Sequence, residues 1–565
     1  MRPLLYAFCY LFLTGAWLLP NHYLPWANFH SEFAAFLGLG VLLFCQLRGH
    51  HARMTLPNPA VASLAVALFL WVQYFTGLVF YAGDAFISSF YIVGFALAIA
   101  AGFAHHKQYM PVKGQNMAWL LPSQVLLSAA GISALLAFLQ WLSLSGDFSV
   151  YMTATNIGDR AMANLGQPNQ LGTLLLMGLA ALVLMFELFK IGPLVVSLGA
   201  ACFTWAIVLT ESRTAILSAV TMSCFLMYKL HQSRTSLQSM RFQAKFIALW
   251  WFLFILAWQL LPIVNEALLM HDSRGIKLLD NNARTTIWLQ TFYAIGESPW
   301  FGYGWNQTAV AQAAGAVHYP GDLAFGNAHN IILDVIAWVG LPLGLFVTVA
   351  FLYWLLTRLN TVRDKSATYA AAMLLPFLVH SLLEHPFAYA YFLLVAGLLI
   401  GIVEASYPQT GVVHISRRVS STVLTLLTIF GGYAAYEYVL IEEDYRVARF
   451  ENLRVGRTEA NYIRPEIFIH TQLRDLLAAL RQPAVRDMDK AQLDRLRKVS
   501  LRFALRPLVF RHALALGLNN QPAAAAQQML VLRSLFGEDA YKNFKSEMRN
   551  LQAEKYPELA KVNLP

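Results

Sequence analysis

Long apolar runs recur through most of this 565-residue chain, and they limit its fold more than any other feature. A membrane-spanning helix needs about 20 consecutive, mostly apolar residues. Strands this apolar would leave backbone groups unpaired in lipid, so we expect helices. Thirteen stretches fit: 4–20, 31–47, 60–80, 85–104, 119–142, 169–189, 191–209, 213–230, 246–263, 331–357, 367–383, 387–404 and 419–440. The sequence therefore predicts an all-α, polytopic membrane protein.

The charged residues are concentrated at the C-terminal end. The chain is 58% hydrophobic and 13% charged, whereas a soluble protein carries about 25% charged residues. Residues 442–565 contain 21 of the 41 Lys and Arg residues and 15 of the 31 Asp and Glu residues. We therefore predict a membrane domain over 1–440 and a soluble helical tail over 441–565. The tail resembles tetratricopeptide arrays without a clean repeat, and its net positive charge suits anionic lipid or an acidic partner.

The cysteines and the N-terminus indicate neither disulfide bonds nor cleavage of a signal peptide. Cys9, Cys45, Cys202 and Cys224 all lie inside apolar runs, so we expect neither disulfides nor a thiolate metal site. Only Arg2 precedes the first run, and no clear small-residue cleavage site follows it. We interpret that run as a retained span and not as a signal peptide.

The Lys and Arg residues between the predicted spans indicate an orientation. With the N-terminus in the cytoplasm, the loops on that side contain 15 of these residues and the opposite loops contain 5. Cytoplasmic loops carry the excess in membrane proteins, and an odd span count then places the tail outside. The five outer cations are Arg160, Arg213, Arg274, Lys277 and Arg284.

Two polar segments stand at predicted span entrances on the outer side. The first, Asn164–Gln170, offers Gln167, Asn169 and Gln170 as amide groups for sugar hydroxyls or phosphate, although an ordinary capped helix start is equally compatible. The second, Glu211–Ala215, carries Arg213 at a helix start, where a forked cation suits phosphate. The alternative for Arg213 is a simple interfacial pair with Glu211.

The longest loop, 264–330, ends in the motif Gly326–Asn330 directly before a predicted span. His329 can accept a proton from a hydroxyl near neutral pH, and Asn327 and Asn330 flank it. Asp334, about one turn into the next helix, is placed to orient it. Arg284 is a second phosphate candidate, and the Gly and aromatic run 298–306 suits either sugar stacking or an interfacial belt.

A last polar cluster, 380–391, joins two predicted spans on the outer side. It contains Glu384, His385, Tyr389 and Tyr391. His380 and His385 match no zinc-ligand spacing, so we predict no metal site. The sequence contains no Gly-rich phosphate loop, so we expect neither a nucleotide nor another cofactor.

Together these segments resemble the O-antigen ligase and polymerase superfamily of bacterial membrane glycosyltransferases, with a GT-C-like membrane fold. The resemblance covers roughly spans six to twelve. The segments 164–170, 211–215, 327–330 and 383–391 are most similar to the PglL-type protein O-oligosaccharyltransferases, and Leu-Gly-Gln-Pro-Asn-Gln at 165–170 is the most specific string. The tail resembles the additional C-terminal region of those enzymes.

The resemblance implies an inner-membrane enzyme with its tail in the periplasm. A glycan on undecaprenyl pyrophosphate would be transferred, without a metal and with inversion, to Ser or Thr of a periplasmic protein such as type IV pilin. His329 would be the base, and Arg213 and Arg284 would neutralise the pyrophosphate. The resemblance also implies glycan or acceptor contacts, and no nucleic acid. Those contacts would come from Gln167, Asn169, Gln170, Asn327, Asn330, Glu384, His385, Tyr389 and Tyr391.

Two other functions remain compatible with the sequence. One is transfer to lipid A core or polysaccharide polymerisation, which needs the same histidine and arginines but a different acceptor. The other is a lipid or glycan transporter with a docking tail. The spans lack an internal inverted repeat and contain few ionisable groups, which disfavours transport.

Overall fold

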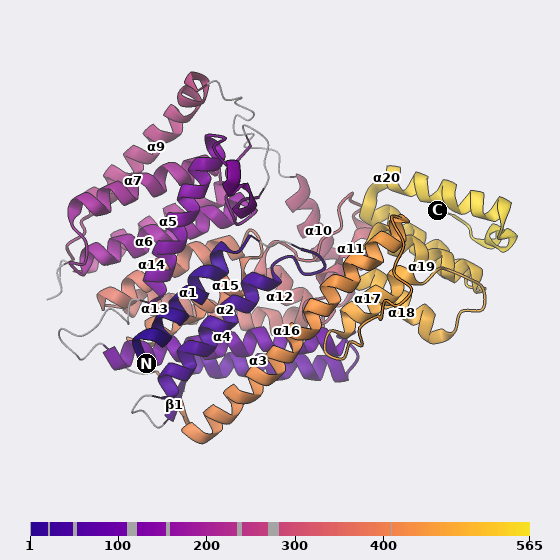
Figure 1. Ribbon diagram of the computed structural model, residues 1–565, viewed down its shortest axis with the longest axis horizontal. Helices are drawn as coiled ribbons and strands as arrows, with labels where there is room; N and C mark the ends of the chain where they lie inside the picture. The colour runs from indigo at the N-terminus through magenta and orange to yellow at the C-terminus, as the bar shows by residue number, and fades with distance from the viewer. Residues whose placement is uncertain are drawn as a thin grey trace. The chain divides into compact units, whose positions relative to one another are not determined.

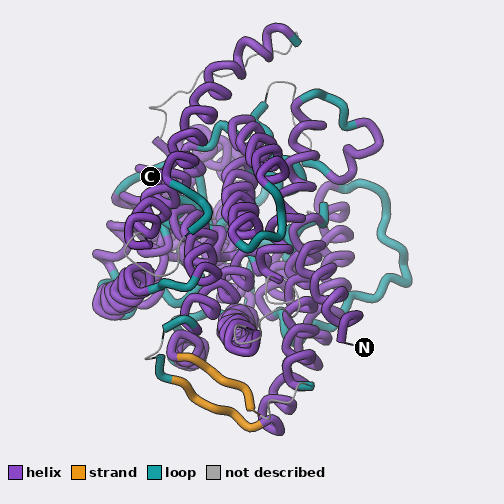
Figure 2. Tube along the Cα trace, turned by 90° about the vertical axis from the view of Figure 1, so that its left-hand side faces the viewer, coloured by secondary structure: helices purple, strands orange, loops and turns teal. Residues whose placement is uncertain are grey.

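The computed structural model describes residues 2–20, 23–48, 53–109, 121–153, 159–233, 240–268, 282–407 and 410–564. Within these ranges helices dominate, as Figure 2 shows in purple, and the sheet drawn in orange is one antiparallel pair of β1 (Arg53–Pro57) and β2 (Val412–Ser416). The predicted all-α class is confirmed. Arg274 and Lys277, two of the five predicted outer cations, lie outside the described residues.

The helices of the N-terminal two thirds follow the predicted spans (Figure 1), except α10 and α11, which lie within the predicted loop 264–330. Their bounds are α1 (Arg2–Leu18), α2 (Phe29–Leu47), α3 (Asn58–Phe75), α4 (Ala82–Tyr109), α5 (Leu121–Trp141), α6 (Pro168–Glu187), α7 (Pro193–Leu209), α8 (Arg213–Ser233), α9 (Ala244–Ala267), α10 (Asn282–Glu297), α11 (Thr308–His318), α12 (Ile331–Val339), α13 (Leu341–Thr361), α14 (Lys365–Ser381) and α15 (Ala390–Ala405). The C-terminal helices are α16 (Arg417–Leu453), α17 (Thr471–Arg481), α18 (Lys490–Phe503), α19 (Arg506–Leu518) and α20 (Pro522–Glu554).

Eight of the described helices are long and apolar enough to cross a membrane: α2, α3, α4, α5, α6, α9, α13 and α16. The helices α1, α7 and α15 are apolar but shorter. Each predicted span thus has a helix at its position, and the chain has the character of a polytopic membrane protein. The count of thirteen crossings and their direction remain predictions.

One predicted span, 331–357, is not a single helix. It divides at Gly340 into α12 and α13, and the nine residues of α12 are too few to cross a bilayer. Gly340 has φ +85°, and a Cβ there would lie 2.2 Å from the carbonyl oxygen of Trp300. A glycine is required at this break because any side chain would collide with that carbonyl.

The chain forms two compact units, and each is described by itself. Unit 1 comprises Met1–Ala65, Tyr91–Leu279 and Leu352–Thr428, and unit 2 comprises Val66–Phe90, Asp280–Phe351 and Ile429–Pro565. The predicted boundary at residue 440 lies inside α16, which is continuous to Leu453. The division into a membrane domain and a tail remains a prediction.

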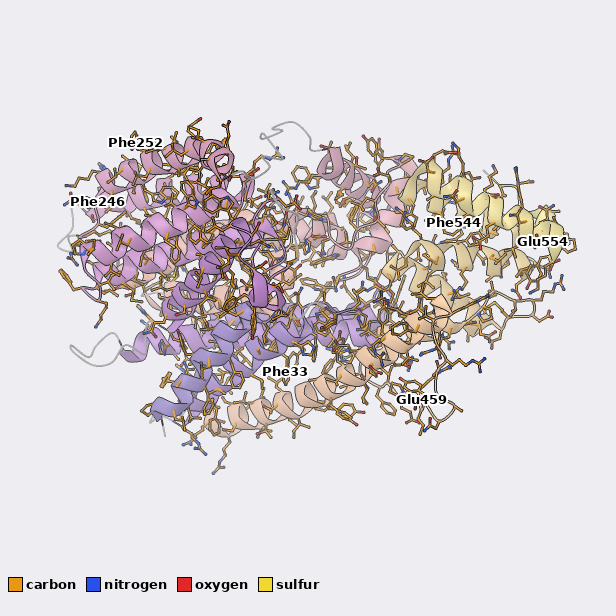
Figure 3. All side chains as sticks on the ribbon, turned by 45° about the horizontal axis from the view of Figure 1, so that its top comes forward. Phe33, Phe246, Phe252, Glu459, Phe544 and Glu554 are labelled. Atoms are coloured by element: carbon orange, nitrogen blue, oxygen red, sulfur yellow. The ribbon has the colours of Figure 1, made fainter. Side chains whose placement is uncertain are left out.

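Unit 1 is a helix bundle around α6. Every residue of α6 from Asn169 to Glu187 is buried, and α5, α7, α8 and α14 pack around it. The helix α9 instead exposes large apolar side chains, including Phe246 and Phe252, which Figure 3 labels. Contiguous exposed apolar surface on a long helix is typical of contact with lipid.

Unit 2 joins the C-terminal helices to α11 and to the start of α4. Ala313 and Ala316 of α11 belong to the same apolar core as residues of α19 and α20, such as Phe510. Figure 3 labels Phe544 of α20, whose ring stacks on Phe510 with the centroids 4.7 Å apart. The guanidinium of Arg502 forms a bidentate ion pair with the buried carboxylate of Asp84 at 2.8 and 2.9 Å. The tail helices are therefore packed against the segment that leads to His329.

Candidate active site

A buried carboxylate, that of Glu384, is the centre of a polar network in unit 1. Asn169 donates from Nδ2 to Glu384 Oε1 at 2.5 Å, and Gln167 donates from Nε2 to Glu384 Oε2. The amide oxygen of Gln167 accepts from the backbone N–H of Gln170 at 2.7 Å, which caps α6 directly before Pro168. The polar helix start and the polar site therefore use the same residues.

The same network reaches the start of α8. Asn169 Oδ1 accepts from Ser212 Oγ at 2.6 Å and from a guanidinium nitrogen of Arg160 at 3.3 Å. Ser212 Oγ also accepts from the backbone N–H of Ala215 at 3.0 Å, so it caps α8. Arg160 was expected only as an outer cation, and its contact with Asn169 makes it a further site residue.

His380 is a second residue that the sequence reasoning did not assign to the site. It is 1% exposed, with Nε2 3.3 Å from Glu384 Oε2 and Nδ1 2.9 Å from Thr173 Oγ1. These two contacts tie the His380 ring to Glu384 and to α6. The i,i+4 spacing from Glu384 was visible in the sequence, and it was the available signal.

The predicted tyrosines lie at the start of α15. Tyr391 donates its hydroxyl to Gln170 Oε1 at 3.1 Å, and the Tyr389 and His385 rings lie 5.8 Å apart. Glu32 of α2 accepts from the backbone N–H of Ala390 at 2.9 Å and from the hydroxyl of Tyr91. Glu32 therefore fixes the segment that carries both tyrosines, although no sequence motif had suggested it.

Arg213 is the first residue of α8 and is exposed. It directly follows Ser212, which bonds Asn169, and Glu211 before it has φ +45°. This turn places the cation at a helix N-terminus, where backbone N–H groups also favour an anion. Unit 1 thus brings together the amides of α6, Glu384, Tyr391 and the start of α8.

His329 lies in unit 2, in a loop that hydrogen bonds to its backbone define. It is half-buried and has φ +53°, which is uncommon for a residue with a side chain. Asn330 caps α12, because its Oδ1 accepts from the backbone N–H groups of Ile332 at 3.0 Å and Leu333 at 3.3 Å. Asn327 is half-buried in the same loop.

Asp334 holds this loop through the peptide before His329. Asp334 Oδ1 accepts from the backbone N–H of Ala328 at 2.9 Å and from Thr308 Oγ1 at 2.7 Å. Trp288 Nε1 donates to the carbonyl oxygen of Ala328 at 3.1 Å, so both ends of that residue are held. Asp334 therefore contacts the His329 loop through the backbone of Ala328, and its role in orienting His329 stays a prediction.

Arg284 is brought onto the same part of unit 2 by its helix. It lies in the first turn of α10 and is half-buried. Trp288 follows it by four residues, so the two share a face of the helix. Since Trp288 bonds the carbonyl oxygen of Ala328, the face of α10 that carries Arg284 contacts the His329 loop.

The aromatic run 298–306 has a structural part and an exposed part. The backbone N–H groups of Tyr303 and Gly304 donate to the carbonyl oxygens of Ala337 and Trp338 at 2.8 and 3.1 Å. Burial raises the pKa of Tyr303 to about 12, so its hydroxyl stays protonated and donates to a carbonyl. Trp300 and Phe301 are 71% and 73% exposed, and they remain available for a sugar or for lipid.

Comparison with known proteins places these segments in a family. Residues 161–186 match the model described as a protein glycosylation ligase, 198–348 match an O-antigen ligase, and 368–550 match the C-terminal part of a virulence factor membrane-bound polymerase. A General O-oligosaccharyltransferase of Acinetobacter baylyi is 29% identical over 95% of this chain and 94% of its own. The chain is thus similar to the PglL-type protein O-oligosaccharyltransferases over nearly its whole length. A second relative in that organism, a ComP-specific O-oligosaccharyltransferase, is 28% identical over 75% of each chain.

Each predicted site residue lies inside one of the three matched regions. The amides of α6 fall in the first, Arg213, Arg284 and the His329 loop in the second, and Glu384 to Tyr391 in the third. Glu32 and Arg160 lie outside all three. The similarity to two O-oligosaccharyltransferases makes the chain a glycosyltransferase and disfavours the transporter hypothesis.

Proposed function

We propose that this enzyme transfers a lipid-linked glycan to a Ser or Thr hydroxyl of an acceptor protein. The observation that carries the proposal is the convergence of three distant segments on one buried polar network. Residues 167–170, 212 and 384 bond one another through side chains inside an apolar bundle. Buried polar groups are costly unless they are satisfied, and both relatives are named O-oligosaccharyltransferases.

The proposed donor is a glycan on undecaprenyl pyrophosphate, presented at the outer face of the inner membrane. The acceptor oxygen attacks the anomeric carbon, the bond from that carbon to the phosphate oxygen breaks, and the configuration inverts. The pyrophosphate leaves with the bonding electrons, and His329 takes the hydroxyl proton. Arg213 and Arg284 neutralise the charge that develops on the leaving group.

The remaining site residues hold the two substrates. Gln167, Asn169, Gln170, Tyr389 and Tyr391 present amide and phenol groups that suit sugar hydroxyls. Glu384 fixes two of these amides, and His385 lies beside Tyr389. Because two guanidinium groups supply the positive charge, the proposed step uses no metal ion.

The proposed topology places the N-terminus in the cytoplasm and the tail in the periplasm, with thirteen crossings. The excess of Lys and Arg in one set of loops supports it. A periplasmic protein such as type IV pilin is the proposed acceptor. Intact-mass analysis of the pilin from a host with and without this gene tests that assignment.

Transfer in vitro from purified lipid-linked glycan to an acceptor peptide tests the chemistry. We expect His329→Ala to lower kcat by at least about 100-fold, since general base catalysis contributes factors of this size. His318→Ala is the matched control, because His318 lies in the same unit and its side chain is 46% exposed. Normal transfer by the His329→Ala protein would overturn the catalytic assignment.

Arg213→Lys tests the recognition of the leaving group. Lys keeps the charge but loses the two-pronged donor geometry, so activity should fall about tenfold. Lys190→Arg is a control on a predicted cytoplasmic loop. Full activity of the Arg213→Lys protein would show that Arg213 contributes charge or packing only.

Ligation to lipid A core or polymerisation of a polysaccharide is the second candidate. The matches to an O-antigen ligase and to a membrane-bound polymerase favour it. Supplying purified protein with a peptide, a core oligosaccharide lipid or a second lipid-linked glycan separates the three reactions. Product only with the peptide supports the proposal, and product only with either glycan acceptor refutes it.

A further inference from the structure

Unit 1 contains a cavity of about 400 Å³ that no candidate active-site residue lines. Its walls come from α2, α4, the turn after α15 and the two-stranded ribbon of β1 and β2. The ribbon is the orange pair in Figure 2. By the distribution of Lys and Arg, this end of the bundle faces the cytoplasm. Glycan transfer at the opposite face does not explain it.

The packing of α4 explains why a cavity forms at this position. α4 and α15 touch at Gly102 and Gly401, where a Cβ on either glycine would lie 2.1 Å from a backbone oxygen of the other helix. The next turn of α4 presents the small side chain of Ala104, and Gln46 of α2 reaches across to the carbonyl oxygen of Ala101 at 3.0 Å. The close contact of α4 with α15 at the glycines, followed by a small side chain one turn later, leaves the cavity between the helices.

The cavity combines cationic and apolar surface. Arg53, Lys107 and His414 line it and are exposed, while Met54 and Phe103 supply apolar wall. No acidic side chain lines it among the residues that the structure describes. The arrangement therefore suits an anion that carries an apolar chain, and it suits a soluble anion poorly because the apolar wall would stay unused.

The ribbon fixes part of this rim. Thr55 and His414 are opposite each other in the register of β1 and β2, and their side chains lie 3.2 Å apart from Oγ1 to Nδ1. Arg53 lies two residues before Thr55, so the alternation of a strand places both on one face. The cation of Arg53 is thus held toward the cavity by the strand pairing.

We propose that this cavity binds an anionic phospholipid of the leaflet on that side, with its phosphate at Arg53 and Lys107. A basic pocket between membrane helices is typical of acidic headgroup binding. Removing both cations should weaken binding about thirty-fold, because each contributes about five- to sixfold near a membrane surface. The proposed transfer reaction needs no part of this site.

Native mass spectrometry of the full-length protein, from vesicles of equal phosphatidylglycerol and phosphatidylcholine, measures the bound lipid. The double variant Arg53→Gln with Lys107→Gln should bind phosphatidylglycerol about thirty-fold more weakly than wild type. The matched control is Arg417→Gln with Arg418→Gln, which removes the same charge from exposed residues that do not line the cavity. The control should retain wild-type binding.

A shape variant keeps the test decisive if the charge variant folds poorly. Ala104→Phe fills the cavity without changing charge and should also displace phosphatidylglycerol. Three results would each overturn the proposal: equal loss in the Arg417 and Arg418 control, full binding by Ala104→Phe, or complete displacement of the lipid by inorganic phosphate. Equal binding of phosphatidylcholine by wild type would overturn the requirement for an acidic headgroup.

Discussion

The Glu384 network of unit 1 and the His329 loop of unit 2 are built by different kinds of bond. Around Glu384, side chains bond side chains from α6, α8 and the end of α14, inside an apolar bundle. Around His329, most of the bonds join a side chain to the backbone, and Asp334 and Trp288 hold the peptide of Ala328. The bond from Thr308 Oγ1 to Asp334 Oδ1 is an exception. In the network, the bonds hold the functional side chains themselves. In the loop, they hold the backbone on either side of His329.

This difference determines how strongly a single substitution lowers activity and stability. A buried network with several members fails as a group, because each lost partner leaves donors or acceptors unsatisfied in a low dielectric. A backbone bond that positions a loop supports one geometry and leaves other bonds in place. Leaving aside His329 itself, the proposed base, we therefore expect larger effects in the network than among the residues that hold the loop.

The largest effect is expected for Glu384→Gln. The substitution keeps the shape but turns one acceptor into a donor that faces the donors of Gln167 and Asn169. Unsatisfied buried groups of this kind cost about 3 kcal/mol, so transfer should fall by at least about 100-fold and the thermal midpoint should drop. Glu266→Gln, at an exposed position of α9, is the matched control and should behave as wild type. Activity of Glu384→Gln within twofold of wild type would make the two regions equivalent.

A smaller effect is expected for Asp334→Ala in the loop. It removes the acceptor for the N–H of Ala328 and for Thr308, which costs about 1.4 kcal/mol or about tenfold in kcat. KM should stay near its wild-type value, because the loop geometry changes and the substrate contacts do not. Asp334→Asn keeps an acceptor and should recover most of the loss. Steady-state kinetics with Asp322→Ala, an exposed residue of the same loop, completes the comparison.

Rescue by Asn is the decisive part of that experiment. If Asp334→Asn were as impaired as Asp334→Ala, the negative charge would matter and not the bond to Ala328. If both variants were fully active, the held peptide would have no bearing on His329.

The two regions were also unequally visible in the sequence. The amides of 167–170, the start of α8 and the His329 motif could be predicted because each is local: a helix start, a cation at a span entrance and a histidine before an apolar run. The convergence of the amides and of the start of α8 on the Glu384 network could not be predicted, because Asn169 and Glu384 are 215 residues apart. Periodicity carries no information about such contacts, and Glu32, which accepts from an N–H 358 residues away, was missed for that reason. His380 was missed although its i,i+4 spacing from Glu384 was visible, and no motif marked Arg160.

The fold shows the same division between local and distant information. Apolar length predicted a helix at each span position. The break at Gly340 depends on the carbonyl oxygen of Trp300, which is distant in the chain, and glycine is common inside membrane helices. The apolar run 331–357 therefore looked like one span until its neighbour was known.

The smallest effect on transfer is expected at Asn330. Its side chain both bonds the backbone of α12 and could contact substrate. Its Oδ1 caps α12, and its amide N–H groups are available for the glycan or acceptor contact that the family resemblance implies. Asn330→Ala should lower stability by about 1 kcal/mol through loss of the cap. Asn330→Asp keeps a good cap, so its thermal midpoint should match wild type while transfer still falls about fivefold, since a carboxylate cannot donate.

Parallel measurement of thermal midpoint and transfer rate in these two variants separates the roles. Full activity of Asn330→Asp would leave Asn330 as a helix cap only. The His329 loop would then consist of one reacting group on a scaffold of backbone bonds, and the contrast with the Glu384 network would be complete. Loss of activity at an unchanged thermal midpoint would instead show that the loop also binds substrate through a side chain, as the network is proposed to do.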